Sequence, residues 1–110
     1  MTILSKLNGQ MKEESFGAYI RHQRESKNLP LRKVAARLDI DTSTLSKVER
    51  GARPISIEYL KPLSQILEIE LKEIQIRYVS DNISKNLNKL EYLSEGLNEV
   101  LNDLKKRKKK

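Results

Sequence analysis

The chain has 110 residues, of which 37% are hydrophobic and 34% charged, and it contains neither cysteine nor tryptophan. This length allows one modest core, and the lack of cysteine excludes disulfides, thiolate nucleophiles and Cys-type zinc sites. The single histidine, His22, has no second ligand at metal spacing, and there is no glycine-rich phosphate loop or nucleophile motif. We therefore predict that the chain is not an enzyme and uses no metal or cofactor.

The formal net charge is +7, but the basic residues are concentrated at the C-terminus, where Lys105 to Lys110 are all Lys or Arg. Such a tail is either a frayed, solvated end or a non-specific polyanion contact, because clustered lysines release counterions from phosphates. Residues 1–13 have weak periodicity and are predicted to form an arm, without the apolar core of a signal peptide. No apolar run is long enough to span a bilayer. We expect a cytoplasmic protein with no membrane partner.

The first two predicted helices follow this arm, and the whole pattern favours an all-α chain because no segment alternates as a strand would. Ser15 is placed to cap the first helix and Asn28 to end it. Pro30 lies at the N-terminal edge of the second helix, where its fixed φ is suitable. That helix is predicted to run from Leu31 to Leu38, with its apolar residues on one face.

The third predicted helix covers about residues 42–50. The polar residues from Asp41 to Thr44 offer several N-caps, and Gly51 is suited to a left-handed C-terminal cap. Leu45 and Val48 should point inward. A fourth helix is expected from Ser56, kinked by Pro62, and a fifth from about Glu70.

The last segment, residues 81–104, has an apolar stripe at heptad spacing and is predicted to form one amphipathic, coiled-coil-like helix. Ser94 is the polar gap in this stripe, and Gly96 weakens the helix enough for a hinge or break there. The stripe either binds a partner or packs back on the domain, and we favour self-association. Its members are Ile83, Leu87, Leu90, Leu97, Leu101 and Leu104.

The segment from Leu29 to Pro54 resembles the helix-turn-helix of the Xre family, the Cro and phage-repressor type. The small Ala35, the turn residue Ile40, the Leu45-Ser46 pair and the run Glu49-Arg50-Gly51 have the spacing of that motif. The resemblance implies a five-helix DNA-binding domain over residues 14–80, followed by the amphipathic helix of 81–104 and the basic tail of 105–110.

The resemblance also implies roles for individual residues. The third helix enters the major groove, and we expect Thr42, Ser43, Ser46 and Lys47 to read base edges. N-capping is an equal alternative for the Thr42 hydroxyl. The expected phosphate contacts are Arg32, Lys33, Arg50 and Arg53. Arg24 and Glu49 are expected to form a structural ion pair, while Arg37 and His22 are expected to lie on the surface.

Two residues depart from the family pattern. The second helix usually begins with a glutamine whose amide binds a phosphate, but this chain has Leu31. That contact is lost or is supplied by Arg32. Gln23 occupies a position where the first helix usually has a leucine, so a polar group is either partly buried or turned outward.

Three functions are compatible with these features. The first is a homodimeric repressor or activator on a pseudo-palindromic operator, including controllers of restriction-modification systems. The second is an antitoxin that binds DNA and uses its C-terminal region to bind a toxin. The third is an adaptor whose C-terminal helix binds another protein. The behaviour of the C-terminal stripe distinguishes them, because an uncovered stripe favours a missing protein partner.

Overall fold

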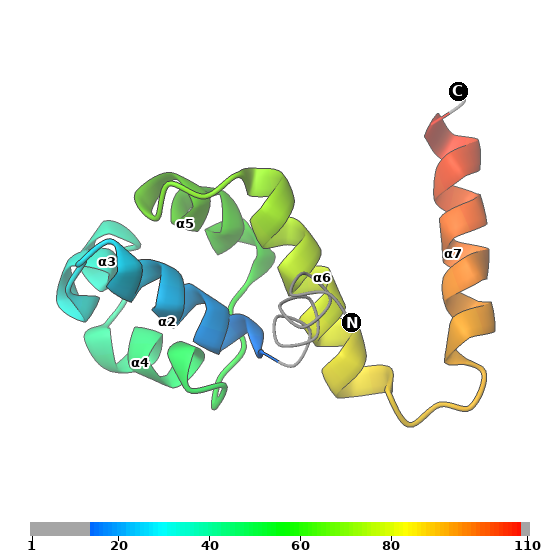
Figure 1. Cartoon of the computed structure of the whole chain (residues 1–110), viewed down its shortest axis with the longest axis horizontal. Helices are drawn as coiled ribbons and strands as arrows, with labels where there is room; N and C mark the ends of the chain where they lie inside the picture. Colours follow the sequence, from blue (N-terminus) through cyan, green and yellow to red (C-terminus); the bar gives the residue numbers. More distant parts are fainter. Residues whose placement is uncertain (1–13, 109–110) are drawn as a thin grey trace, which may run out of the picture. The chain divides into compact units, whose positions relative to one another are not determined.

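A computed structural model describes residues 14–108, and all regular secondary structure in this part of the chain is helical (Figure 1). The prediction of an all-α chain is confirmed. The chain divides after Val79 into two compact units, which are described separately. The helices are α2 (Phe16–Ser26), α3 (Leu31–Arg37), α4 (Thr42–Glu49), the 3-10 turn η1 (Ile57–Tyr59), α5 (Leu60–Ile66), α6 (Leu71–Leu87) and α7 (Leu93–Lys108). The predicted arm, residues 1–13, and the tail residues Lys109 and Lys110 lie outside the described residues.

The ends of α2 agree with the sequence prediction. The Ser15 hydroxyl accepts a hydrogen bond from the Ala18 backbone N–H at 3.1 Å, which satisfies one free donor of the first turn. After the helix, Asn28 has a φ of 55°, a left-handed conformation that asparagine tolerates better than most residues and that stops the helix. Pro30 then occupies the N-cap position of α3.

The turn between α3 and α4 is tight. Asp39 has a φ of 58°, and Asp41 occupies the N-cap position of α4 without a capping side-chain hydrogen bond. Thr42 is the first helical residue, so its hydroxyl does not serve as the cap. At the other end, Gly51 has a φ of 75°, as predicted for a left-handed cap.

The fourth helix differs from the prediction. The segment after Ser56 begins with the 3-10 turn η1, and the α-helix α5 starts only at Leu60. Pro62 therefore lies in the first turn of α5, where backbone N–H groups have no partner within the helix. The missing donor of Pro62 is tolerated there, and the expected kink inside a longer helix is replaced by the change from 3-10 to α geometry.

A single apolar core holds the first unit together. Ala35 is fully buried, which allows α3 to approach α4 closely, and Ile40 packs on the core from the turn between them. Both α2 and α3 pack on α4. The buried apolar residues are Phe16, Tyr19, Ile20, Val34, Ala35, Leu38, Leu45, Val48, Ile55, Leu60, Leu63, Leu67 and Ile74.

The C-terminal segment corrects the prediction of one helix over residues 81–104. Helix α6 continues through Leu87, the chain turns between Asn88 and Tyr92, and α7 then runs to Lys108. The predicted stripe is therefore divided between two helices, with Leu90 in the turn. Asn88 has low helix propensity and offers no apolar contact, which allows the break there. Gly96, the expected weak point, lies within α7.

Candidate nucleic-acid interface

Helix α4 is fixed to the domain by one face. Leu45 is fully buried and Val48 is 4% exposed, and both belong to the core beneath α2 and α3. Because three or four residues separate neighbours on a helix face, the opposite face of α4 is left to solvent. The core therefore fixes the rotation of α4 about its own axis.

The four predicted base-reading residues lie on the free side and at the start of α4. Thr42, Ser43 and Lys47 are exposed, and Ser46 is half-buried. Ser43, Ser46 and Lys47 share one face at helical spacing, and Thr42 stands at the N-terminus. These groups offer hydroxyl donors and acceptors and one ammonium donor, which can pair with base edges.

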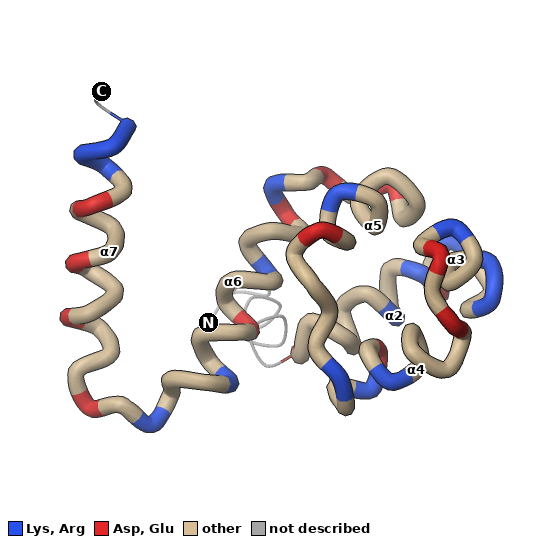
Figure 2. The backbone as a smooth tube through the Cα atoms, turned by 180° about the vertical axis from the view of Figure 1, so that it is seen from behind, with Lys and Arg blue, Asp and Glu red and all other residues tan. Residues whose placement is uncertain are grey.

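The residues predicted to contact phosphates come before and after α4 in the sequence. Arg32 and Lys33 are exposed in the first turn of α3, and Arg53 is exposed in the loop after α4. Arg50 is also exposed, and its Nε donates to the Ser46 backbone carbonyl at 3.3 Å. The tube in Figure 2 shows Lys and Arg on α3 and around the end of α4. Arg37, expected on the surface, is exposed as well.

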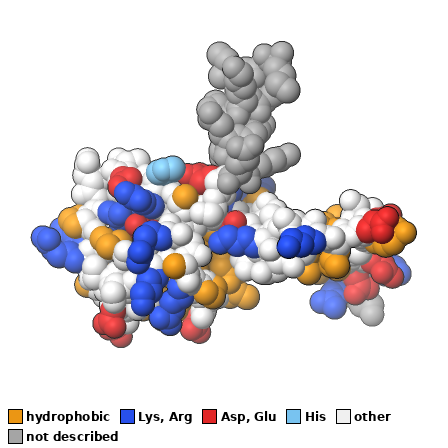
Figure 3. Space-filling view, turned by 90° about the horizontal axis from the view of Figure 1, so that it is seen from below, with side chains coloured by type: hydrophobic (Ala, Val, Ile, Leu, Met, Phe, Trp, Pro, Cys, Tyr) orange, Lys and Arg blue, Asp and Glu red, His pale blue; other side chains and the backbone are white. Residues whose placement is uncertain are grey.

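Positive charge gathers on one face of the first unit. Figure 3 views the molecule from below, the side on which α4 lies in Figure 1, and shows Lys and Arg side chains across this face, with few acidic groups among them. A basic surface that carries a polar helix matches the charge of a nucleic-acid backbone.

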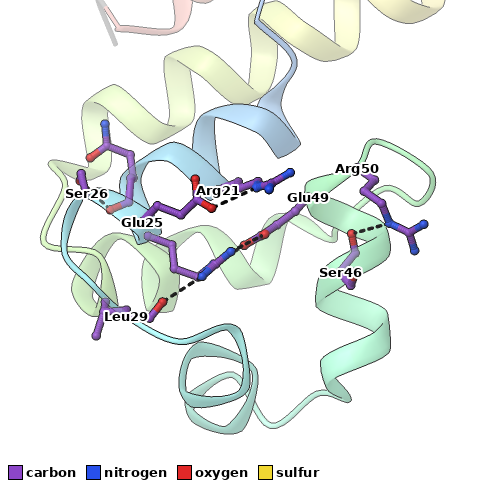
Figure 4. A network of polar contacts seen from close by, with 9 residues as sticks. Arg21, Glu25, Ser26, Leu29, Ser46, Glu49 and Arg50 are labelled. Carbon is purple, nitrogen blue, oxygen red and sulfur yellow. Dashed lines mark hydrogen bonds and ion pairs between the residues drawn. The ribbon is translucent and has the colours of Figure 1, made fainter.

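The structure brings Arg24 and Glu49 together in a two-point ion pair (Figure 4). Arg24 Nε donates to Glu49 Oε2 at 2.7 Å, and Nη2 donates to Oε1 at 3.0 Å. A third bond joins Arg24 Nη1 to the Leu29 carbonyl at 2.9 Å. The hydrogen bonds that Arg24 donates to the Glu49 carboxylate raise the pKa of Arg24 above its usual range. This network connects α2, the loop before α3 and the end of α4.

Gly17 is a second anchor of α4 that the sequence interpretation did not single out. A Cβ at Gly17 would lie 2.1 Å from the Val48 carbonyl oxygen and 2.8 Å from that of Glu49. Only glycine allows the start of α2 to lie directly on the end of α4. An isolated glycine beside Phe16 within a helical pattern was the signal available in the sequence.

A further cluster connects α2 to α6 on the same unit. Glu14 pairs with His22 and, at 3.0 Å, with Arg77, and the Arg77 guanidinium lies 4.6 Å from the centre of the Tyr19 ring. His22 is 66% exposed, as expected for a surface residue. Among residues 14–108 no group of three or more His, Asp or Glu is arranged to hold a metal ion.

The two departures from the family pattern have structural consequences. Leu31 is half-buried and packs against the core. An apolar group at the start of α3 thus adds to the core where the family pattern has an amide, and Arg32 is the nearest exposed side chain able to replace it. Gln23 is half-buried.

An anchored helix with a free polar face, preceded by a tight turn and a supporting helix, defines a helix-turn-helix DNA-binding protein. A family model described as helix-turn-helix matches residues 20–74, half of the chain. The chain therefore belongs to the helix-turn-helix family, in its Xre type, whose members regulate transcription by binding DNA.

Individual relatives agree with this assignment. Two uncharacterized HTH-type transcriptional regulators, from two strains of Mycobacterium tuberculosis, are each 33% identical to this chain over 61 residues. The matched region covers 56% of this chain and 44% of each relative, so the chain spans less than half the length of these relatives. No solved structure matches the chain. Within residues 14–108, no helix has both the length and the apolar composition required to cross a bilayer.

Proposed function

We propose that this chain is a sequence-specific regulator that binds double-stranded DNA in the cytoplasm as a homodimer, on a pseudo-palindromic operator. The observation that carries the proposal is the geometry of α4, whose apolar face is buried while its polar face is free and flanked by exposed arginines. This arrangement suits insertion into a major groove, which is wide enough for one helix. In a two-fold dimer the two copies of α4 would contact half-sites one helical turn apart, roughly 34 Å.

Within this proposal, side chains divide into two roles. Thr42, Ser43, Ser46 and Lys47 read bases, and the Lys47 ammonium donates to guanine O6 and N7. Arg32, Lys33, Arg50 and Arg53 bind phosphates and position the domain on the duplex without reading sequence. The Arg24–Glu49 pair keeps α4 in place and has no direct contact with DNA.

The test compares two lysine variants. Each variant first selects its preferred binding sites from a pool of random DNA duplexes, and its affinity for those sites is then titrated at several salt concentrations. The Lys47→Ala variant should lose sequence preference and on the order of 1–3 kcal/mol of specific binding. The Lys72→Ala variant removes an exposed lysine from α6 and is the matched control. If the Lys47→Ala variant kept the preferred site and affinity of the unmodified chain, the assignment of α4 as reading helix would be wrong.

The residues proposed to bind phosphates need a different measurement, because their loss should weaken binding to all DNA sequences by similar factors. The Arg50→Ala and Arg53→Ala variants should each bind more weakly and show a smaller dependence of affinity on salt, by about one counterion. A change in the preferred sequence would instead make either arginine a base-reading residue.

One observation favours a second candidate function. No residue of α7 is buried in the described chain, as expected for a segment that takes up a protein partner. An antitoxin that binds DNA through residues 14–80 and a toxin through its C-terminal region has this feature, and so does an adaptor. Co-expression with the product of the adjacent gene decides between them, since a restriction-modification controller would form no stable complex with its neighbour.

A further inference from the structure

The C-terminal segment of the chain carries most of its net charge. Six of the 22 Lys and Arg residues occupy positions 105–110, and the 16 others are almost balanced by 15 Asp and Glu. The formal net charge of +7 therefore depends almost wholly on this short segment. Because net charge governs the long-range attraction of a protein to a polyanion, the C-terminal segment is the main source of such attraction in this chain.

The described part of this segment is helical, which argues against the frayed end that the sequence also allowed. Lys105, Lys106, Arg107 and Lys108 form the last turn of α7, and all four are exposed. Figure 2 shows this basic turn, residues 105–108, beyond the acidic residues of α7. Since a helix has 3.6 residues per turn, four successive side chains project on every side of its axis. The basic turn can therefore approach an anion from any side of α7.

Most of these charges are not used within the chain. Arg107 lies 3.8 Å from Asp103, but both side chains are largely exposed, so their pairing contributes little. Lys105, Lys106 and Lys108 pair with no acidic group in the part of the chain that the structure describes. The helix dipole favours bases in a last turn, but this effect is weak at an exposed helix end. Three unpaired ammonium groups are therefore available to an external anion.

We propose that the basic turn binds the phosphate backbone of double-stranded DNA, as a second and sequence-independent contact in addition to the helix-turn-helix. This inference rests on the proposed DNA-binding function and adds a binding surface outside the first unit. Clustered lysines release counterions when they bind phosphates, and this release favours binding. Because the basic turn and α4 belong to one chain, the second contact is intramolecular once the first has formed, which raises its effective concentration.

The charge pattern of α7 favours DNA over an anionic membrane surface. Glu95, Glu99 and Asp103 follow one another at intervals of four residues, which places them together on the side of α7 away from its leucines. Helices that lie on a membrane carry lysines and arginines along that polar side, whereas α7 is basic only in its last turn. A compact positive cluster matches the dense charge of a duplex, which has one phosphate per about 1.7 Å of axis.

The experiment compares two variants of the full chain that lose the same number of positive charges. The basic-turn variant contains Lys105→Gln, Lys106→Gln and Lys108→Gln. The control variant replaces three exposed lysines that have no proposed contact with DNA: Lys72→Gln, Lys85→Gln and Lys89→Gln. Gln has a helix propensity close to that of Lys, so α7 should remain helical. Fluorescence anisotropy measures the affinity of each protein for a random-sequence duplex at several salt concentrations, and light scattering verifies that the three proteins have the same mass.

The two variants should differ in the salt dependence of binding. The basic-turn variant should bind the duplex at least about tenfold more weakly at low salt. Its slope of log affinity against log salt should be shallower by about two to three per chain, close to 0.9 for each lost phosphate contact. The control should change this slope by less than about one. The preferred site of the basic-turn variant should remain that of the unmodified chain, because phosphate contacts carry no sequence information.

The contrary results separate this proposal from the proposed function. Equal slopes for the two variants would overturn the second contact, while a preferred site that depends on Lys47 would leave the proposed function intact. A changed preferred site in the basic-turn variant would also overturn the proposal, because the basic turn would then read bases. Binding to phosphatidylserine vesicles that only the basic-turn variant loses, at unchanged DNA affinity, would assign the basic turn to a membrane surface instead. An unmodified chain without sequence preference would contradict the proposed function alone, since the difference in slope would still support the second contact.

Discussion

The two units of the chain deal with apolar residues in opposite ways. Residues 14–79 bury a set of leucine, isoleucine and aromatic side chains in a shared core, and their polar groups fix one helix in orientation. Helix α7 has a comparable apolar stripe but buries no residue. The first unit therefore contains the interactions that determine its own fold, whereas the second is amphipathic without a surface to pack on. We therefore expect DNA reading and self-association to reside in separate segments.

Removal of α7 is the most drastic way to test this difference. A chain that ends after Leu87 keeps the whole of α6, and we expect it to be folded but monomeric in solution. Full unfolding on removal of α7 would contradict the separation of the two units. Circular dichroism and light scattering measure the two properties.

A matched pair of substitutions in the full chain repeats the test without truncation. Leu101→Asp introduces a charge into the stripe and should abolish the dimer, whereas Asn102→Asp, one residue further on, should preserve it. A truncated chain that remained dimeric would place the self-association surface within residues up to 87 and would refute the role assigned to α7.

The second test compares ion pairs in the two units. Glu49 and Arg24 are only 5% and 12% exposed, whereas Asp103 and Arg107, 3.8 Å apart on α7, are 69% and 75% exposed. Glu49→Ala leaves a buried guanidinium unpaired and should lower the free energy of unfolding by about 3–5 kcal/mol. Asp103→Ala should lower it by no more than about 0.5 kcal/mol. Urea unfolding measures both, and equal losses would show that Glu49 is not a structural anchor.

The third test compares the glycines of the two units. Gly17→Ala places a methyl group against the backbone of α4, and we expect a loss of about 1–3 kcal/mol together with weaker DNA binding, because α4 must shift. A Cβ at Gly96 has nothing within 4 Å, so Gly96→Ala should stabilise α7 by about 1 kcal/mol. Thermal unfolding measures both changes. An unchanged midpoint for Gly17→Ala would contradict the close contact between α2 and α4.

The sequence predicted the features that depend on local chemistry. The Ser15 cap and the left-handed Gly51 follow from residue type and position, and the buried face of α4 follows from helical spacing. The resemblance to the Xre family contributed the pairing of Arg24 with Glu49. Contacts between distant segments that lack a periodic signal, such as Gly17 on α4 and Arg77 beside Glu14 and Tyr19, were beyond this reasoning.

The C-terminal break was missed for a related reason. Heptad spacing from Ile83 to Leu104 describes the positions of apolar residues, but it carries no information on whether the backbone between them is continuous. The turn at Asn88–Tyr92 contains Leu90, which fits the repeat while lying outside both helices. The prediction of the four base-reading residues concerns contacts with DNA and stays a prediction.

Tyr19 provides the smallest expected effect and a test of the core by pH. Burial, followed by the negative charge of Glu73, raises the pKa of Tyr19 well above its ordinary value of 10.0. Above that value the unfolded chain loses this proton while the folded chain keeps it, so stability should fall as pH rises. We expect a loss of about 1 kcal/mol from this group between about pH 9 and about pH 11.

Urea unfolding of variants isolates the Tyr19 contribution from other groups that titrate in this range. Tyr19→Phe lacks the phenol, and its stability should decline less steeply over the same pH interval. Tyr92→Phe changes a phenol on a residue that is 69% exposed in the second unit, and it should keep the slope of the unmodified chain. Because only a phenol buried on folding resists ionisation, a difference between the two variants would assign the slope to the core of the DNA-binding unit. Identical slopes in all three proteins would mean that water reaches the Tyr19 hydroxyl and that the contact between α2 and α6 opens in solution.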